Sequence, residues 1–336
     1  MSASDGAGLD VCGVGNALVD IITHDTDDFL TTHGLVRGTT RMVDLETAQS
    51  VYADLKPAQE ISGGSAANTM AGVASFGASA AYIGRVCDDQ FGEVFVHDLR
   101  SLGVRFDVPP ATDGLATGRC LIIVDEADGQ RTMCTYLGIS SALGPAEVDD
   151  TLPATAQVTY LEGYLWDQPP AKEAIRRAAG AARAAGRRVA MTLSDPFCVE
   201  RHRDEFRRLV AGEVDVLFAN EHEICSLYEV DDFDDALARV RDECEMAALT
   251  RSEHGSVVAT SDAVHVVAAD PVERVVDSTG AGDQYAAGFL VGLTRGADPE
   301  TCGRLGSLAA GEVITHVGAR PEVSLAERAR RAGLLG

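Results

Sequence analysis

Short runs of apolar, β-branched residues alternate along this chain with longer amphipathic or alanine-rich segments. The runs are expected to be strands and comprise residues 9–14, 80–83, 158–161, 188–193, 214–218 and 246–250. The segments with helical spacing between them include residues 168–185, 199–211 and 233–244. This alternation predicts an α/β fold with a doubly wound, mostly parallel sheet and helices on both faces. Ligands of such sheets bind at the carboxyl ends of the strands.

Two segments, at about 16–43 and 106–137, break this alternation. Their strand-like pieces are residues 18–23, 39–43, 118–124 and 131–136, with no helical pattern between them. They predict a small antiparallel sheet inserted into a single domain of residues 1–336, with a hairpin turn at residues 125–129. A small sheet over the active site would act as a lid that excludes water.

Charge and composition narrow the class of partner. The formal net charge of -24 argues against a nucleic-acid or anionic-membrane partner, because either would need a basic face. No apolar run approaches the roughly 18 residues needed to cross a membrane. Residues 1–8 lack the basic start and apolar stretch of a secretory signal. We therefore expect a cytoplasmic enzyme that acts on small molecules.

The residues from Asp277 to Asp283 read D-S-T-G-A-G-D and precede a helix-like run. Small residues at a helix start leave main-chain N–H groups open to an anion, and the helix dipole attracts negative charge there. A carboxylate beside such a site is repulsive unless it takes a proton from the group that attacks a phosphate. The segment therefore predicts phosphoryl transfer, with Asp283 as the base.

A second glycine-rich stretch, residues 63–68 (G-G-S-A-A-N), opens an expected helix that runs to Ser75. The glycine pair permits a close approach of the backbone to a ligand, and Ser65 and Asn68 offer hydrogen bonds to a hydroxylated one. The alternative is a glycine turn followed by a serine N-cap.

Asp20 lies in an expected strand among apolar neighbours, where its carboxylate needs a partner. A pair of sugar hydroxyls would be one, and a backbone turn capped by the side chain would be another.

Asn220 and Glu223 follow the strand at 214–218 and lie one turn apart at a helix start. Their oxygens suit a magnesium ion held through water, and they equally suit an N-cap with a capping box. The two interpretations are compatible.

Known nucleotide signatures are missing elsewhere. The chain has no G-x-x-x-x-G-K-[ST] and no protein-kinase motifs, which excludes a P-loop NTPase. Phosphates must then be bound by main-chain amides and arginine, and Arg131 in a lid-like strand is the best placed; the alternative is a solvated surface arginine.

Taken together, these motifs resemble the signatures of the PfkB carbohydrate kinase family, also called the ribokinase family. Residues 277–283 are similar to its C-terminal signature D-T-x-G-A-G-D, with Ser278 in a tolerant position. Residues 63–68 are similar to part of its N-terminal signature, and residues 220–223 to its N-x-x-E magnesium motif. The ordered match covers almost the whole chain and implies a ribokinase-like fold with a small β-sheet lid.

The resemblance implies in-line transfer from MgATP. Asp283 would activate the acceptor hydroxyl, and the amides of Gly280, Ala281 and Gly282 would bind the γ-phosphate. The implied acceptor contacts are Asn16, Asp20, Gly63, Gly64, Ser65, Asn68, Arg131, Glu162 and Tyr164. The implied ATP contacts are Asn220, Thr250, Ser252, Gly255, Thr279, Gly280 and Gly282. Asn220 and Glu223 would order Mg²⁺, largely through water, and a K⁺ ion, as in some members, would lie at Asp277, Thr279, Val313 and Gly318.

Within the family, residues 14–21 and 63–65 look most like the adenosine kinase-like members, and residues 130–132 resemble the segment where those place a phosphate-contacting arginine. Tyr164 then stands where a ring stacks on a nucleobase, although a core aromatic is the alternative. Glu162 resembles a sugar-contacting residue of ribokinase-like members. The expected reaction phosphorylates the 5′-hydroxyl of a nucleoside, with adenosine as first choice and a simple sugar such as ribose or fructose second.

A hypothesis of a different class is a non-catalytic nucleoside or sugar sensor on the same fold. A sensor needs no base beside an anion site, so Asp283 favours catalysis. Family members include monomers and homodimers that meet through their lids, and the sequence favours neither.

Overall fold

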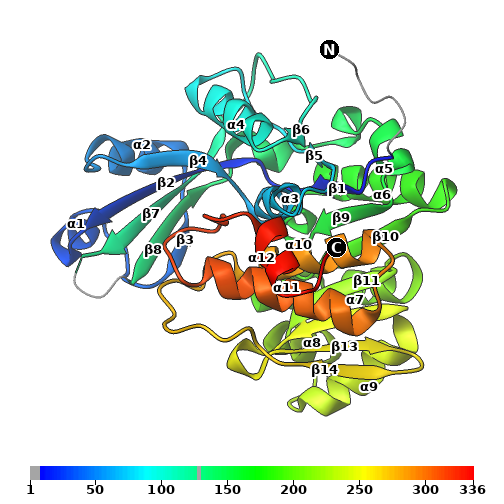
Figure 1. The fold of residues 1–336 in the computed structure, drawn as a ribbon. Coiled ribbons are helices and arrows are strands. Elements are labelled where there is room, and N and C mark those ends of the chain that lie inside the picture. The colour runs from blue at the N-terminus through cyan, green and yellow to red at the C-terminus, as the bar shows by residue number, and fades with distance from the viewer. Residues whose placement is uncertain (1–7, 127–129) are drawn as a thin grey trace.

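The computed structural model describes residues 8–126 and 130–336. A nine-stranded sheet forms its centre, in the order β14-β13-β12-β11-β10-β9-β1-β5-β6 (Figure 1). The strands are β1 (Val11–Val14), β5 (Ala80–Ile83), β6 (Val104–Arg105), β9 (Val158–Glu162), β10 (Arg188–Thr192), β11 (Val216–Asn220), β12 (Met246–Thr250), β13 (Ser256–Thr260) and β14 (Val264–Val267). Pairings from β6 to β12 are parallel, and those of β13 are antiparallel. This confirms the mostly parallel sheet.

Two groups of helices pack on this sheet. One group consists of α3 (Ser65–Ser75), α10 (Ala281–Thr294), α11 (Pro299–Val313) and α12 (Leu325–Arg331). The other consists of α6 (Pro169–Ala184), α7 (Pro196–Gly212), α8 (Glu221–Tyr228) and α9 (Phe233–Glu243). The sequence of α6 explains its packing on the sheet. Its buried residues, mostly alanines, recur at helical spacing, and these small side chains let the helix lie close to β9 and β10. The remaining α4 (Gln90–Ser101) and α5 (Thr151–Thr155) lie beside β6 and α6.

A second sheet has five strands in the order β3-β8-β7-β2-β4 and lies to one side of the first, on the left in Figure 1. Its strands are β2 (Leu18–Asp25), β3 (Thr40–Met42), β4 (Gln59–Gly63), β7 (Gly118–Asp125) and β8 (Arg131–Tyr136). Helices α1 (Asp27–Thr32) and α2 (Leu45–Ala53) accompany them.

The second sheet differs from the prediction in three ways. Its pairings β2–β7 and β3–β8 are parallel, because the long chain segments between these strands leave room for a crossover. Helix α1 lies inside the segment expected to be free of helix. The sequence also gives little sign of β4, a polar edge strand in which Ile61 is the single large apolar residue. Residues 127–129 of the predicted hairpin turn lie outside the described residues.

The chain order across the main sheet reverses at β1, which lies between β5 and β9. The loops after β1 and β9 therefore meet at the carboxyl edge of the sheet, where ligands of such folds bind. Within residues 8–126 and 130–336, no helix combines the length and the apolar character needed to cross a lipid bilayer.

Candidate functional site

The start of α10 presents unused main-chain donors. Gly280 precedes the helix with a φ of 77°, a left-handed conformation that suits glycine. The N–H of Ala281 bonds to the Ser278 carbonyl (3.2 Å), and that of Gln284 bonds to the Gly280 carbonyl (2.8 Å). No hydrogen bond in the described part of the chain uses the N–H of Gly280 or Gly282. Two of the three predicted anion donors are thus open, while Ala281 closes the turn.

Asp283 lies in the first turn of α10 and is held by α3. Its carboxylate accepts from the Ser65 hydroxyl (2.6 Å) and from Asn68 Nδ2 (3.2 Å). Burial raises the pKa of Asp283, and both hydrogen bonds act in the opposite direction. The structure therefore brings together three of the predicted residues in one hydrogen-bonded group.

Helix α3 begins where it does because of Gly64. This residue joins β4 to α3 with a φ of 96°, and a Cβ atom here would collide with the Asn16 carbonyl. The alternative of a serine N-cap is wrong, because Gly64 is the N-cap and Ser65 is already in the helix.

Asp20 lies on β2, on the sheet face that it shares with Ile22 and, across the ladder, with Ile61 and Cys120. Its side chain is 9% exposed, and no hydrogen bond to its carboxylate is found within the residues the structure describes. Burial raises its pKa to about 7; the Asp283 charge adds to the rise, and Arg320 and Arg131 oppose it. A Cβ atom on Gly63 would collide with this carboxylate. Asp20 is thus a polar group in need of a ligand.

Arg131 reaches from β8 to Asp277, the first residue of the motif. The two side chains are buried and form an ion pair at 2.5 Å. Asp277 also accepts from the N–H groups of Thr279 (3.0 Å) and Gly318 (2.9 Å). With both oxygens engaged and a guanidinium beside them, the Asp277 carboxylate does not fit a further cation. Val313, the remaining residue of the predicted K⁺ site, is the buried last residue of α11.

Glu162 is fully buried and hydrogen-bonded to neighbouring protein groups. Its side chain is 1% exposed and accepts from Asn16 Nδ2 (2.7 Å) and the Ala66 N–H (3.0 Å). Burial raises its pKa to about 7, and these hydrogen bonds lower it. Asn16 is also buried, and its Oδ1 accepts from Ser140 (3.1 Å). Glu162 therefore supports Asn16 and the first turn of α3.

Asn220 and Glu223 form the capping box of α8. Asn220 Oδ1 accepts from the Glu223 N–H (2.9 Å), and the Glu223 carboxylate accepts from the Asn220 N–H (3.0 Å). Burial raises the pKa of Glu223 to about 7. Both residues line a cavity of about 170 Å³ together with Ser65, Thr250 and Asp283. This confirms the predicted capping box, and a magnesium ion bound through water stays compatible with it.

The side-chain oxygens of Asn220 and Glu223 at this cavity suit a magnesium ion that is bound mainly through water and phosphate. No group of three or more His, Cys, Asp or Glu side chains within the described residues could hold a metal ion alone. Mg²⁺ commonly keeps several waters and uses one or two protein carboxylates. Asn220 and Glu223 fit that style of binding.

A larger cavity of about 640 Å³ adjoins the small one, and the two share Thr250, Gly282 and Tyr285 as lining residues. Its other lining residues include Ser252, Gly255, Val272, Val275, Ser278 and Ile314. The predicted ATP contacts Thr250, Ser252, Gly255 and Gly282 therefore surround one space. Its apolar side chains suit a flat ring system.

Tyr164 lies after β9, with 37% of its surface exposed. Its hydroxyl donates to the Ser194 carbonyl (3.3 Å), and Ser194 lines the small cavity. The ring is thus exposed and anchored near the site, which is not the position of a core aromatic.

Arg320 is a residue of this site that sequence reasoning missed. Its Nε donates to Asn68 Oδ1 (2.8 Å), opposite the amide nitrogen that bonds to Asp283. The only sequence signal is its position two residues after Gly318, and nothing there separates it from the other arginines.

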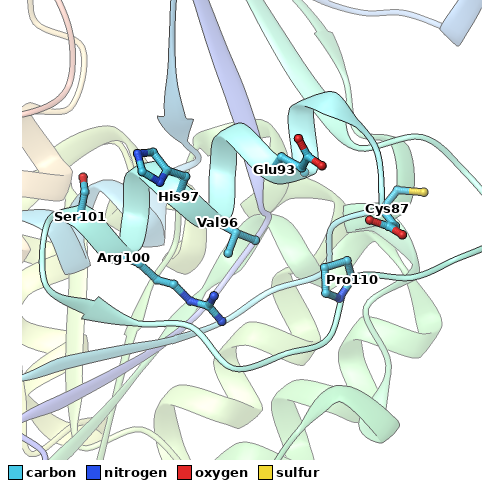
Figure 2. A pocket seen from close by; sticks show the side chains of 9 residues that line it. Cys87, Glu93, Val96, His97, Arg100, Ser101 and Pro110 are labelled. Carbon is cyan, nitrogen blue, oxygen red and sulfur yellow. The ribbon is translucent and has the colours of Figure 1, made fainter.

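A separate cavity of about 480 Å³ lies along α4, lined by Glu93, His97 and Arg100 among others (Figure 2). The Arg100 guanidinium donates two hydrogen bonds to the Phe106 carbonyl (3.1 and 2.6 Å), so it supports the adjoining loop. None of the predicted site residues lines this cavity.

Comparison with known proteins agrees with this arrangement. The pfkB family of carbohydrate kinases matches residues 41–325. The adenosine kinase of Sinorhizobium meliloti superimposes with a TM-score of 0.90 and 52% identity, covering 97% of this chain and 100% of that one. A Rhizobium etli protein described as a "probable sugar kinase" has a TM-score of 0.91 and 49% identity, covering 97% and 99%. The adenosine kinase of Saccharomyces cerevisiae is 27% identical over 91% of this chain and 94% of its own length.

These likenesses confirm a ribokinase-like α/β fold. Because the family match extends over most of the residues, from β3 to the start of α12, this chain belongs to the pfkB family of carbohydrate kinases and is a phosphotransferase.

Proposed function

We propose that this enzyme transfers the γ-phosphate of ATP to the 5′-hydroxyl of a nucleoside, with adenosine as the preferred acceptor. The observation that carries the proposal is the start of α10, where a held carboxylate, Asp283, lies beside the open N–H groups of Gly280 and Gly282. The carboxylate can take a proton, and the two N–H groups can bind a phosphate. Gly282 lines both adjoining cavities and Asp283 lines the smaller one, an arrangement that suits a reaction of two substrates.

In the proposed reaction Asp283 takes the proton of the acceptor hydroxyl as its oxygen attacks phosphorus. Ser65 and Asn68 keep the carboxylate oriented toward that oxygen. The N–H groups at the helix start stabilise the charge on the transferred phosphoryl group. Mg²⁺, when bound at Asn220 and Glu223 through water, supplies further positive charge to the phosphates.

Asp20 and the second sheet belong to the acceptor side of the proposal. The unpaired Asp20 carboxylate suits the two vicinal hydroxyls of a ribose, which would supply its missing hydrogen bonds. Arg131 lies on the same sheet, so its strand would serve as part of a lid over the acceptor, with its guanidinium near the phosphates.

Two observations favour a nucleoside over a free sugar. An apolar cluster of Ile22, Cys120, Ile122 and Val124 shares the sheet with Asp20, and the exposed ring of Tyr164 is anchored through its hydroxyl to Ser194, which lines the small cavity. A base offers apolar ring faces to such groups, whereas a free sugar does not. The likeness to the Sinorhizobium meliloti adenosine kinase supports the same acceptor, and that to the Rhizobium etli protein keeps a sugar as second candidate.

An ADP-release assay with a panel of acceptors tests the proposal. We expect turnover with adenosine to exceed that with ribose or fructose by at least about 10²-fold in kcat/KM, since a free sugar forfeits the contacts of the base. Other nucleosides should fall between. Robust turnover of a free sugar without turnover of adenosine would establish the second candidate, and binding of either without ADP release would indicate a sensor.

The Tyr164→Ala variant tests the stacking role separately. Loss of one base contact is expected to raise KM for adenosine about tenfold, from a stacking contribution of about 1–1.5 kcal/mol, with kcat little changed. The KM for ATP serves as an internal control and should stay constant. An unchanged KM for adenosine would show that Tyr164 contacts Ser194 alone.

A further inference from the structure

Arg320, in the loop after α11, is connected to Asp283 through a single side chain. Its Nε donates to Asn68 Oδ1 (2.8 Å), and Asn68 Nδ2 donates to Asp283 Oδ2 (3.2 Å). A terminal nitrogen of the guanidinium donates to the carbonyl (2.5 Å) and the hydroxyl (3.1 Å) of Ser62. Arg320 thus connects three elements by hydrogen bonds: the edge strand β4 through Ser62, helix α3 through Asn68, and, through Asn68, the Asp283 carboxylate at the start of α10.

The chemistry of these groups leaves the Asn68 amide one orientation. A guanidinium can only donate hydrogen bonds, and an ionised carboxylate can only accept them. The amide oxygen must therefore face Arg320 and the amide nitrogen must face Asp283. Without Arg320 the amide is free to rotate and present its oxygen to the carboxylate, which would repel it.

The position of Arg320 is itself fixed from both sides. Gln284 Nε2, next to Asp283 in sequence, donates to the Ala319 carbonyl (2.9 Å), and Asp277 accepts from the Gly318 N–H (2.9 Å). On the far side, Ser62 donates its hydroxyl to Asp98 (2.5 Å). The loop that carries Arg320 is therefore attached to both ends of the 277–283 motif.

We propose that Arg320 is a positioning residue for phosphoryl transfer, which fixes the Asn68 amide against Asp283 and places a positive charge behind it. The proposal rests on the proposed function, in which Asp283 is the base. A neutral side chain at this place would leave the base both less well oriented and less often ionised at neutral pH.

The charges around Asp283 explain why a cation is needed there. The carboxylates of Asp20 on β2 and Glu162 on β9 repel an ionised Asp283, Tyr160 on β9 stays neutral, and α3 contributes only the neutral Ser65 and Asn68. The Arg320 charge lowers the pKa of Asp283, against the rise caused by burial. It also lowers the pKa of Asp20, which Arg131 faces as well.

The test compares Arg320→Gln, which keeps a donor but loses the charge, with Arg320→Lys, which keeps the charge on an unbranched amine. The measurement is kcat against pH from 5 to 8 at saturating acceptor and MgATP, which reports on the bound complex. Losing the cation raises the pKa of the base, so in Arg320→Gln the acidic limb should move to higher pH by about one unit. In Arg320→Lys the limb should stay in place, while kcat falls about tenfold, because an ammonium lacks the fork that reaches Asn68 and Ser62 together.

A merely structural role of Arg320 would lower the melting temperature and leave the pH limb where it is in wild type. An unmoved limb in a folded Arg320→Gln enzyme overturns the proposal, as does an equal displacement in Arg320→Lys. Should Arg320→Gln not fold, Arg320→Lys decides: a wild-type kcat overturns the proposal and the tenfold loss supports it. Failure of the proposed function appears elsewhere, as an Asp283→Asn enzyme that keeps its rate.

Discussion

An Asp283→Asn enzyme is expected to lose about 10³-fold in kcat while binding its acceptor and ATP within about threefold of wild type. The amide cannot take a proton from the attacking hydroxyl. It can still be accommodated, with its nitrogen donating to Ser65 Oγ and its oxygen accepting from Asn68, so the local hydrogen bonds of the carboxylate survive in number. The measurements are steady-state ADP release and calorimetric binding of the acceptor.

The control for this variant removes a carboxylate elsewhere. Glu93 lies on α4 in the cavity of Figure 2, away from the predicted site residues, and Glu93→Gln should retain wild-type kcat and KM. If Asp283→Asn matched that control in rate, a different group would have to accept the proton. If it lost binding along with rate, Asp283 would be an acceptor contact and not the base.

Substituting Gly280 by alanine is expected to have the second largest effect. The residue has a φ of 77°, and its Cβ would lie 2.6 Å from both Cα and Cβ of Ala319. The backbone must shift, which should cost about 1–3 kcal/mol in the free energy of unfolding. Because the same peptide supplies an open donor to the phosphate, kcat should also fall about 10²-fold. Thermal unfolding and steady-state kinetics measure the two effects.

Gly296 offers a matched control for this prediction. It has a similar φ of 73°, just beyond the end of α10, but a Cβ there would meet no atom within 4 Å. Gly296→Ala should therefore show the strain of the left-handed conformation without a loss of kcat. A Gly280→Ala enzyme with the kinetics of Gly296→Ala would mean that the helix start does not bind the transferred phosphate.

Six strands of the main sheet, β1, β5 and β9 to β12, could be predicted because each is a short, largely buried apolar run, as at Ala80–Ile83. Strands β6, β13 and β14 were not predicted: β6 has two residues, and β14 is an edge strand in which only Val267 is buried. The anion site at the start of α10 could also be predicted, because small residues such as G-A-G before an apolar helix leave main-chain N–H groups open. Strand β4 was missed because an edge strand needs little apolar pattern, and Gln59–Gly63 has almost none. The pattern of a strand also carries no information about its partner, which is why the parallel pairing of β2 with β7 was not foreseen.

The contacts within the site were harder to predict than its members. Glu162 and Asn16 both appeared as ligand contacts, yet the structure pairs them with each other, because a buried carboxylate takes its hydrogen bonds from the donors packed around it, here Asn16 and the Ala66 N–H. Arg131 appeared as a phosphate contact, and its ion pair with Asp277 depends on two segments well separated in sequence. The role of Arg320 likewise depends on where a loop folds back, and no local pattern records that.

The short connection between β4 and α3 bears on the hydrolysis of ATP in the absence of an acceptor. Gly64 alone separates the second sheet from the helix that holds Asp283, so the sheet cannot move far without changing the torsion angles at the head of that helix. In the proposed reaction the acceptor draws the sheet in through Asp20. With the sheet displaced, the first turn of α3 would hold Asp283 less well, so in the proposed reaction transfer of phosphate to water is expected to be slow until the acceptor is bound.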